Sequence, residues 1–110
     1  MSLTFSEYQE FTRTTRIYNP KDAIVYPMLG LAGETGECSE LVKKMLRDDD
    51  GIMTEERKEK FLGEIGDVLY YVAALADDVG FDLGDIVDFN VSKLTSRKER
   101  GVLSGSGSNR

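Results

Sequence analysis

A five-residue word occurs twice in this chain, and each copy lies inside a segment whose apolar residues follow a helical period. The copies are Gly33-Glu34-Thr35-Gly36-Glu37 and Gly63-Glu64-Ile65-Gly66-Asp67. Because residues i and i+3 of a helix share a face, the two acids of each word point the same way. Glu34 and Glu64 also interrupt apolar stripes, which predicts that both carboxylates are partly buried and need a compensating charge.

Two such pairs on neighbouring helices predict a cage of four carboxylates, formed by Glu34, Glu37, Glu64 and Asp67. The pairs suit one ion's coordination sphere, since three residues of helix rise about 4.5 Å. One E-x-x-E alone is usually a solvated helix face. The repetition, the interrupted stripes and the interior glycines, each of which costs roughly 0.5–1 kcal/mol in a helix, favour a metal site here.

The composition narrows the chemistry of that site. The chain has no histidine and one cysteine, Cys38, which excludes Ser-His-Asp and Cys-His catalysis, Glu-x-x-His di-iron sites, zinc sites built from Cys and His, and an intrachain disulfide. Oxygen ligands remain, and these suit Mg²⁺ or Mn²⁺.

The apolar periodicity predicts an all-α protein of four helices, with no alternation long enough for a sheet. The expected helices run from a capping box at Ser6-Glu7-Tyr8-Gln9 to about Thr15, from Tyr26 to Arg47, from a cap at Thr54 to Val79, and from Asp82 or Leu83 to about Arg100. At 110 residues, we expect one domain over 1–100 and a flexible Gly/Ser-rich tail over 101–110. Because four short helices bury little alone, we expect a homodimer or homotetramer.

The net charge of −6 argues against a nucleic-acid polymer as partner. No apolar run is long enough for a membrane span and no signal peptide is evident, so we expect a reduced, cytoplasmic protein with no membrane partner. The charge is uneven: residues 1–90 carry −10 and residues 91–110 carry +4. The basic end either compensates a helix dipole or contacts phosphate.

Five further polar residues fit a phosphate-bearing substrate: Lys43, Lys44, Asn90, Lys93 and Arg97. Lys43 and Lys44 lie about two turns after the first word, and the other three share one face of the fourth helix. Each also fits a solvated helix face.

Three segments together resemble the MazG-like nucleotide pyrophosphohydrolases, of the all-α NTP pyrophosphatase superfamily. They are Gly30 to Glu37, then Glu64 to Tyr70, then Asn90 to Leu94. The resemblance implies a four-helix protomer that assembles into an oligomeric helical bundle. It also implies Mg²⁺ held by Glu34, Glu37, Glu64 and Asp67, and water attack on the α-phosphorus of a nucleoside triphosphate, which leaves a monophosphate and pyrophosphate. Lys43, Asn90, Lys93 and Arg97 are then candidate nucleotide contacts.

The chain departs from many relatives at one position, where Gly33 replaces the first of two adjacent acids. Glu34 and Glu37 both remain candidates for the group that accepts the proton from water. Other enzymes with the same four acids stay open: a dUTPase or dCTPase, and a phosphoribosyl-ATP pyrophosphohydrolase. A non-catalytic helical interaction module with a structural metal is the alternative from a different class.

Overall fold

The computed structural model describes residues 2–110, and no strand occurs among them. The helices are α1 (Phe5–Arg13), the short 3-10 helix η1 (Pro20–Asp22), α2 (Val25–Asp48), α3 (Glu55–Asp78) and α4 (Leu83–Glu99). This confirms the expected all-α class with four α-helices. No helix within the described residues is both long and apolar enough to cross a bilayer.

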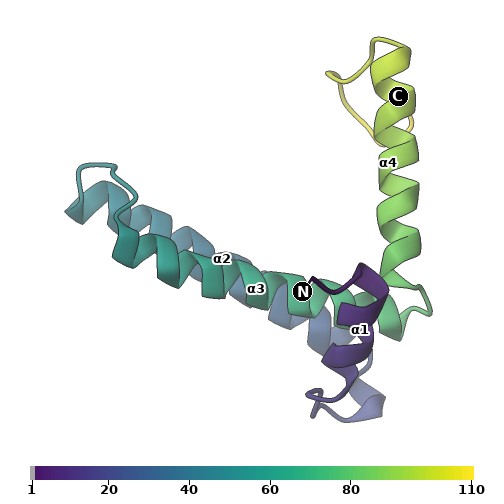
Figure 1. Cartoon of the computed structure of the whole chain (residues 1–110), viewed down its shortest axis with the longest axis horizontal. Helices are drawn as coiled ribbons and strands as arrows, with labels where there is room; N and C mark the ends of the chain where they lie inside the picture. Colours follow the sequence, from purple (N-terminus) through teal and green to yellow (C-terminus); the bar gives the residue numbers. More distant parts are fainter. Residues whose placement is uncertain (1) are drawn as a thin grey trace.

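The two long helices, α2 and α3, form an antiparallel hairpin that carries both acidic words (Figure 1). The turn between them uses Gly51 at φ +77°, a conformation that suits glycine. Arg57 in the first turn of α3 forms ion pairs with Asp48 and Asp49, which fasten the turn. Thr54 caps α3 as predicted, because its hydroxyl accepts a hydrogen bond from the Arg57 amide.

The capping box of α1 lies two residues earlier than predicted. Thr4 is the N-cap: its hydroxyl accepts from the Glu7 amide at 3.1 Å, and the Glu7 carboxylate accepts from the Thr4 amide at 2.8 Å. Ser6 instead donates to Asp82 at 2.6 Å. The predicted box at Ser6 was wrong because its fourth residue, Gln9, is taken up by tertiary contacts.

Gln9 ties α1 to the turn between α3 and α4. Its side chain is fully buried, and its amide nitrogen donates to the carbonyls of Ala73 and Phe81 at 3.4 and 3.0 Å. Its carbonyl oxygen accepts from the Leu83 amide at 2.9 Å. A second contact between α1 and α3 is the bidentate ion pair from Arg13 to Asp77, at 2.7 Å for each bond. Together these bonds fix α1 across the end of the hairpin.

Helix α4 projects away from the hairpin, so the protomer has an angular shape with two arms (Figure 1). Within the described residues, its contacts to α1 and α3 lie near its N-terminal end, where Leu83 is buried. The tail after α4 folds back on it rather than extending. Arg97 donates to the Ser108 carbonyl at 2.7 Å, and Arg110 donates to the Leu103 and Val102 carbonyls.

The protomer exposes more surface than a compact chain of its size. Its accessible area is 7956 Å², whereas a folded monomer of its mass exposes about 6,100 Å². Its radius of gyration is 16.8 Å, against about 13 Å for a compact domain of this length. Exposed apolar side chains lie on both arms, including Leu62 and Ile65 on α3 and Ile86 and Phe89 on α4. Few residues are fully buried, so the core of one protomer is small.

Candidate metal centre and substrate groove

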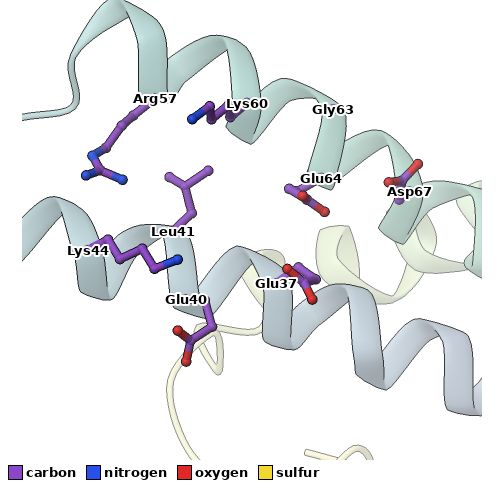
Figure 2. Close-up of a pocket in the computed structure, with 9 residues that line it drawn as sticks. All are labelled: Glu37, Glu40, Leu41, Lys44, Arg57, Lys60, Gly63, Glu64 and Asp67. Carbon is purple, nitrogen blue, oxygen red and sulfur yellow. The ribbon is translucent and has the colours of Figure 1, made fainter.

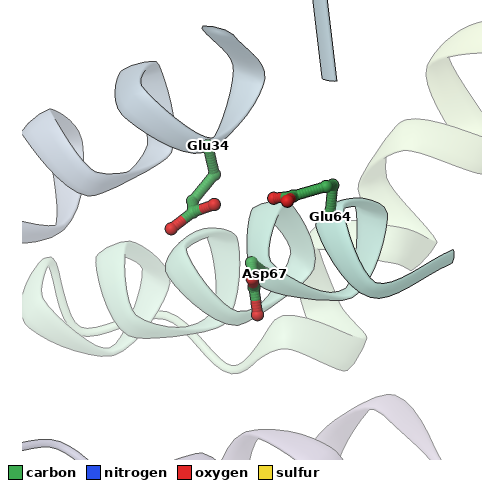
Figure 3. A group of neighbouring side chains, drawn as sticks. All are labelled: Glu34, Glu64 and Asp67. Carbon is green, nitrogen blue, oxygen red and sulfur yellow. The ribbon is translucent and has the colours of Figure 1, made fainter. Parts of the chain in front are cut away.

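Three of the four predicted metal ligands lie together at the middle of the hairpin. Carboxylate oxygens of Glu34, Glu64 and Asp67 are all within 4.8 Å of one another, and Figure 3 shows Glu34 reaching from α2 towards the two acids of α3. Glu34 and Glu64 are half-buried and Asp67 is exposed. The helical register produces this arrangement, because each pair of acids occupies one face of its own helix and the two faces meet.

The cluster is electrostatically unfavourable in the absence of a cation. Burial, followed by the negative charges of Asp67 and Glu64, raises the pKa of the Glu34 carboxyl above its ordinary value. A set of clustered oxygen donors with excess negative charge matches what a hard divalent cation requires. The residues present therefore fit Mg²⁺ or Mn²⁺ by donor type and charge.

Glu37, the fourth predicted ligand, is exposed and lies one turn beyond Glu34 on α2. Its oxygens are not part of the 4.8 Å cluster. It lines a groove between α2 and α3, of about 320 Å³, together with Glu64 and Asp67. Figure 2 shows Glu37 on one wall and Glu64 on the facing wall. Glu64 and Asp67 thus belong to both the cluster and the groove, whereas Glu34 belongs to the cluster alone and Glu37 to the groove alone.

The other end of this groove is basic. Lys44 comes from α2, and Arg57 and Lys60 come from α3; their side chains gather around Leu41 (Figure 2). Glu40 also lies at this end. The groove therefore runs from carboxylates to cations along the hairpin. Lys44 was predicted together with Lys43 and lies seven residues after Glu37, on the same helix face. Lys60 was not among the predicted residues, although it lies four residues before Glu64 and so shares the face of that acid.

The other predicted lysine at this end, Lys43, does not line the groove. Its ammonium pairs with Glu40 at 2.9 Å, and its side chain borders a shallow surface with Thr35 and Phe61. One residue of helix corresponds to a rotation of about 100°, which is why Lys44 faces the groove and Lys43 does not. A role for Lys43 in substrate binding remains a prediction without a contact in this protomer to support it.

The predicted residues of α4 lie away from the acids of the same protomer. None of Asn90, Lys93 and Arg97 lines the groove, since α4 points away from the hairpin. Asn90 is exposed and Lys93 half-buried, whereas Arg97 is 6% exposed beneath the folded-back tail. The Arg97 Nε atom is buried without a hydrogen-bond partner among the described residues.

One of the interior glycines has a clear packing reason. A Cβ atom at Gly30 would lie 2.5 Å from ring carbons of Tyr71, so only glycine admits this ring against α2. By contrast, a Cβ added to Gly33, Gly36, Gly63 or Gly66 meets no described atom within 4 Å. Packing among the described residues therefore does not explain these four glycines.

Comparison with known proteins identifies the family of the chain. A family model described as MazG nucleotide pyrophosphohydrolase domain matches residues 27–102. The Gene 37 protein of Mycobacterium phage L5 is 46% identical over 89 residues, which is 81% of this chain and 78% of that protein. No solved structure matches the chain. The matched residues contain both acidic words, the groove and all of α4.

Proposed function

The chain belongs to the MazG nucleotide pyrophosphohydrolase domain family, and from this premise we propose that it hydrolyses nucleoside triphosphates to monophosphates and pyrophosphate with Mg²⁺. The observation that carries the proposal is the cluster of Glu34, Glu64 and Asp67, two of whose members, Glu64 and Asp67, also line the acidic end of a groove with a basic far end. Such a groove complements a metal-bound anion. A purely structural metal site would need neither the groove nor its cations.

Glu34, Glu64 and Asp67, with Glu37 at the open side, are the residues that would hold the metal. When bound, Mg²⁺ supplies charge neutralisation for the phosphates and acidity for a coordinated water. In the reaction, a water oxygen bonds to the α-phosphorus, the bond from that phosphorus to the bridging oxygen breaks, and pyrophosphate leaves. A carboxylate accepts the water's proton, and Glu34 and Glu37 are the candidates.

We further propose that the protein works as an oligomer whose sites are completed by α4 of a neighbouring copy. The support is physical: the protomer exposes roughly 1,900 Å² more than a compact monomer of its mass, an amount typical of an obligate interface. On α4, the exposed Phe89 directly precedes Asn90 and shares a helix face with Lys93. A partner that covers this apolar face therefore also meets Lys93.

The decisive experiment for the activity is pyrophosphate release from a panel of nucleoside triphosphates, with and without Mg²⁺. The panel includes dUTP, dCTP and phosphoribosyl-ATP, so it also identifies a specialist enzyme. Glu64→Gln keeps the shape of the side chain and removes its charge, and we expect a loss of at least about 100-fold in turnover. Ser39→Ala is the control, because Ser39 is exposed on α2 and its hydroxyl donates to the Thr35 carbonyl of the same helix.

Mg²⁺ should also raise the melting temperature of the parent protein, because a ligand that binds only the folded state stabilises it by about 2.7 kcal/mol at 100 times its Kd. Glu64→Gln should reduce that gain. Near-normal turnover in Glu64→Gln would refute the assignment of the cluster as the catalytic metal site.

A further inference from the structure

The basic end of the groove is the part of the hairpin that the metal cluster does not explain. Lys44 of α2 and Lys60 of α3 both line the groove there, with Leu41 between them (Figure 2). Lys44 forms no ion pair with any carboxylate in residues 2–110. Lys60 has only a loose contact to Glu56, at 3.6 Å between two exposed side chains, which is a weak interaction in water. Both ammonium groups are therefore available to an anion in the groove.

The third cation, Arg57, differs from these two lysines. Its side chain is 19% exposed and is held by Asp48 and Asp49 in the turn of the hairpin. Its charge is already compensated by these carboxylates, so it serves the fold. Lys44 and Lys60 are therefore the two cations of the groove whose charge is not compensated by a close ion pair in the fold.

The ordinary explanation for a basic residue on a helix does not cover both lysines. Cations suit the C-terminal turns of a helix, and Lys44 lies near the end of α2. Lys60, however, lies in the second turn of α3, close to the positive end of that helix dipole, where a cation gains nothing. The helix dipole thus favours the lysine of α2 and does not favour the lysine of α3, although both line the same end of the groove. This points to a shared anionic ligand.

We propose that Lys44 and Lys60 bind the β- and γ-phosphates of the substrate, and so hold the pyrophosphate that leaves. The inference rests on the proposed function, which puts the α-phosphorus at the acidic cluster. From there, Lys60 is one helical turn from Glu64, and Lys44 is two turns from Glu37, a rise of roughly 10 Å along the groove. The phosphate chain is the only strongly anionic part of a nucleoside triphosphate. The two lysines consequently select for a chain of phosphates beyond the bond that breaks.

Binding of inorganic pyrophosphate, measured by calorimetry with Mg²⁺ present, tests this subsite without any need for turnover. The probe variant is Lys44→Ala with Lys60→Ala; both side chains are exposed, so the fold should persist, as circular dichroism would verify. We expect the dissociation constant for pyrophosphate to rise by at least about tenfold, as charge-assisted hydrogen bonds are lost. Replacing both lysines by arginine should retain most of the affinity. Lys58→Ala is the matched control, because Lys58 is an equally exposed α3 lysine that borders a different surface.

Kinetics provide a second readout. In the double alanine variant, kcat/KM for a nucleoside triphosphate should fall by at least about tenfold, with a much smaller change for the corresponding diphosphate, which lacks the outer phosphate.

Unchanged pyrophosphate affinity in the double alanine variant, or no measurable affinity in the parent protein, would overturn the proposal. A parent protein that releases no pyrophosphate from any triphosphate refutes the activity, whereas lysine-dependent pyrophosphate binding in that same protein still supports the subsite.

Discussion

The exposed apolar face of α4 offers the sharpest test of how this domain completes its site. Phe89 is 72% exposed and borders a hollow with Phe81 and Ile86. A phenylalanine side chain buries roughly 200 Å² when covered, so a partner would remove roughly 140 Å² of Phe89 from water. At about 25 cal/mol per Å², this corresponds to about 3.5 kcal/mol for each copy, and a twofold interface contains two copies.

Phe89→Asp removes that contribution and adds a charge that the interface must desolvate. We expect the dimer dissociation constant to rise by more than about 1,000-fold, which sedimentation equilibrium at micromolar concentration would detect as monomer. Asp88→Asn is the control, since it changes a neighbouring exposed polar residue by a similar amount of charge. If Phe89→Asp sediments like the parent protein, the exposed apolar face of α4 does not form the interface.

The same interface predicts complementation between two inactive variants. Glu64→Gln damages the hairpin and Lys93→Ala damages α4, so a mixed dimer contains one site with an intact hairpin and an intact partner helix. Random exchange of subunits should restore roughly a quarter of the parent activity. A mixture of Glu64→Gln with Asp67→Asn should restore none, because both changes lie on the hairpin. Recovery in neither mixture would show that α4 of a partner does not complete the site.

Two further predictions concern the fold that supports the site. The hydrogen bond from Arg13, reinforced by Arg16, holds the pKa of the Asp77 carboxyl below its ordinary value. The ionised carboxylate of Asp77 therefore stabilises the fold above about pH 4, and this stabilisation is lost as the pH falls through the lowered pKa. Asp77→Asn should therefore lower the free energy of unfolding, measured with urea at pH 7, by about 1–2 kcal/mol. It should also weaken the loss of stability at acid pH, and an unchanged loss at acid pH would contradict this. Gly30→Ala should cost about 1–3 kcal/mol because its Cβ meets the Tyr71 ring, and the cost should shrink in a Tyr71→Ala background, whereas equal costs in both backgrounds would exclude the clash.

The helices were predictable because their signals are local. Thr54 and Asp82 cap α3 and α4 as the sequence indicates, and the apolar periods of α2 and α3 fix the faces that meet in the hairpin. The start of α1 was harder, because two overlapping segments fit a capping box. The choice between Thr4 and Ser6 depends on Gln9, which binds groups more than 60 residues away in the chain. Long-range hydrogen bonds of this kind leave no periodic pattern in a sequence.

In the candidate site, too, some positions follow from local helical register and others depend on long-range contacts. Glu34, Glu64 and Asp67 could be brought together from spacing alone, because helical register determines which acids share a face. Register also distinguishes Lys44 from Lys43, so the groove-facing lysine was available from the sequence by counting from Glu37. The position of Arg97 was not, since its burial depends on a tail that folds back through backbone carbonyls. Gly/Ser composition indicates flexibility and does not reveal such contacts.

We infer a link between assembly and activity from the distribution of apolar surface in this domain. The hairpin carries the acids and a groove with cations, yet a Cβ atom added at any of the four glycines of its acidic words would meet no neighbouring group within 4 Å in residues 2–110. Helix α4 carries Lys93 and Asn90 beside exposed apolar side chains, and nothing in the described chain covers Phe89. If a second copy fills both vacant surfaces, burial of apolar area stabilises the fold and delivers the polar side chains in one event. Stability and turnover should then fall together on dilution, because mass action removes the partner that both require.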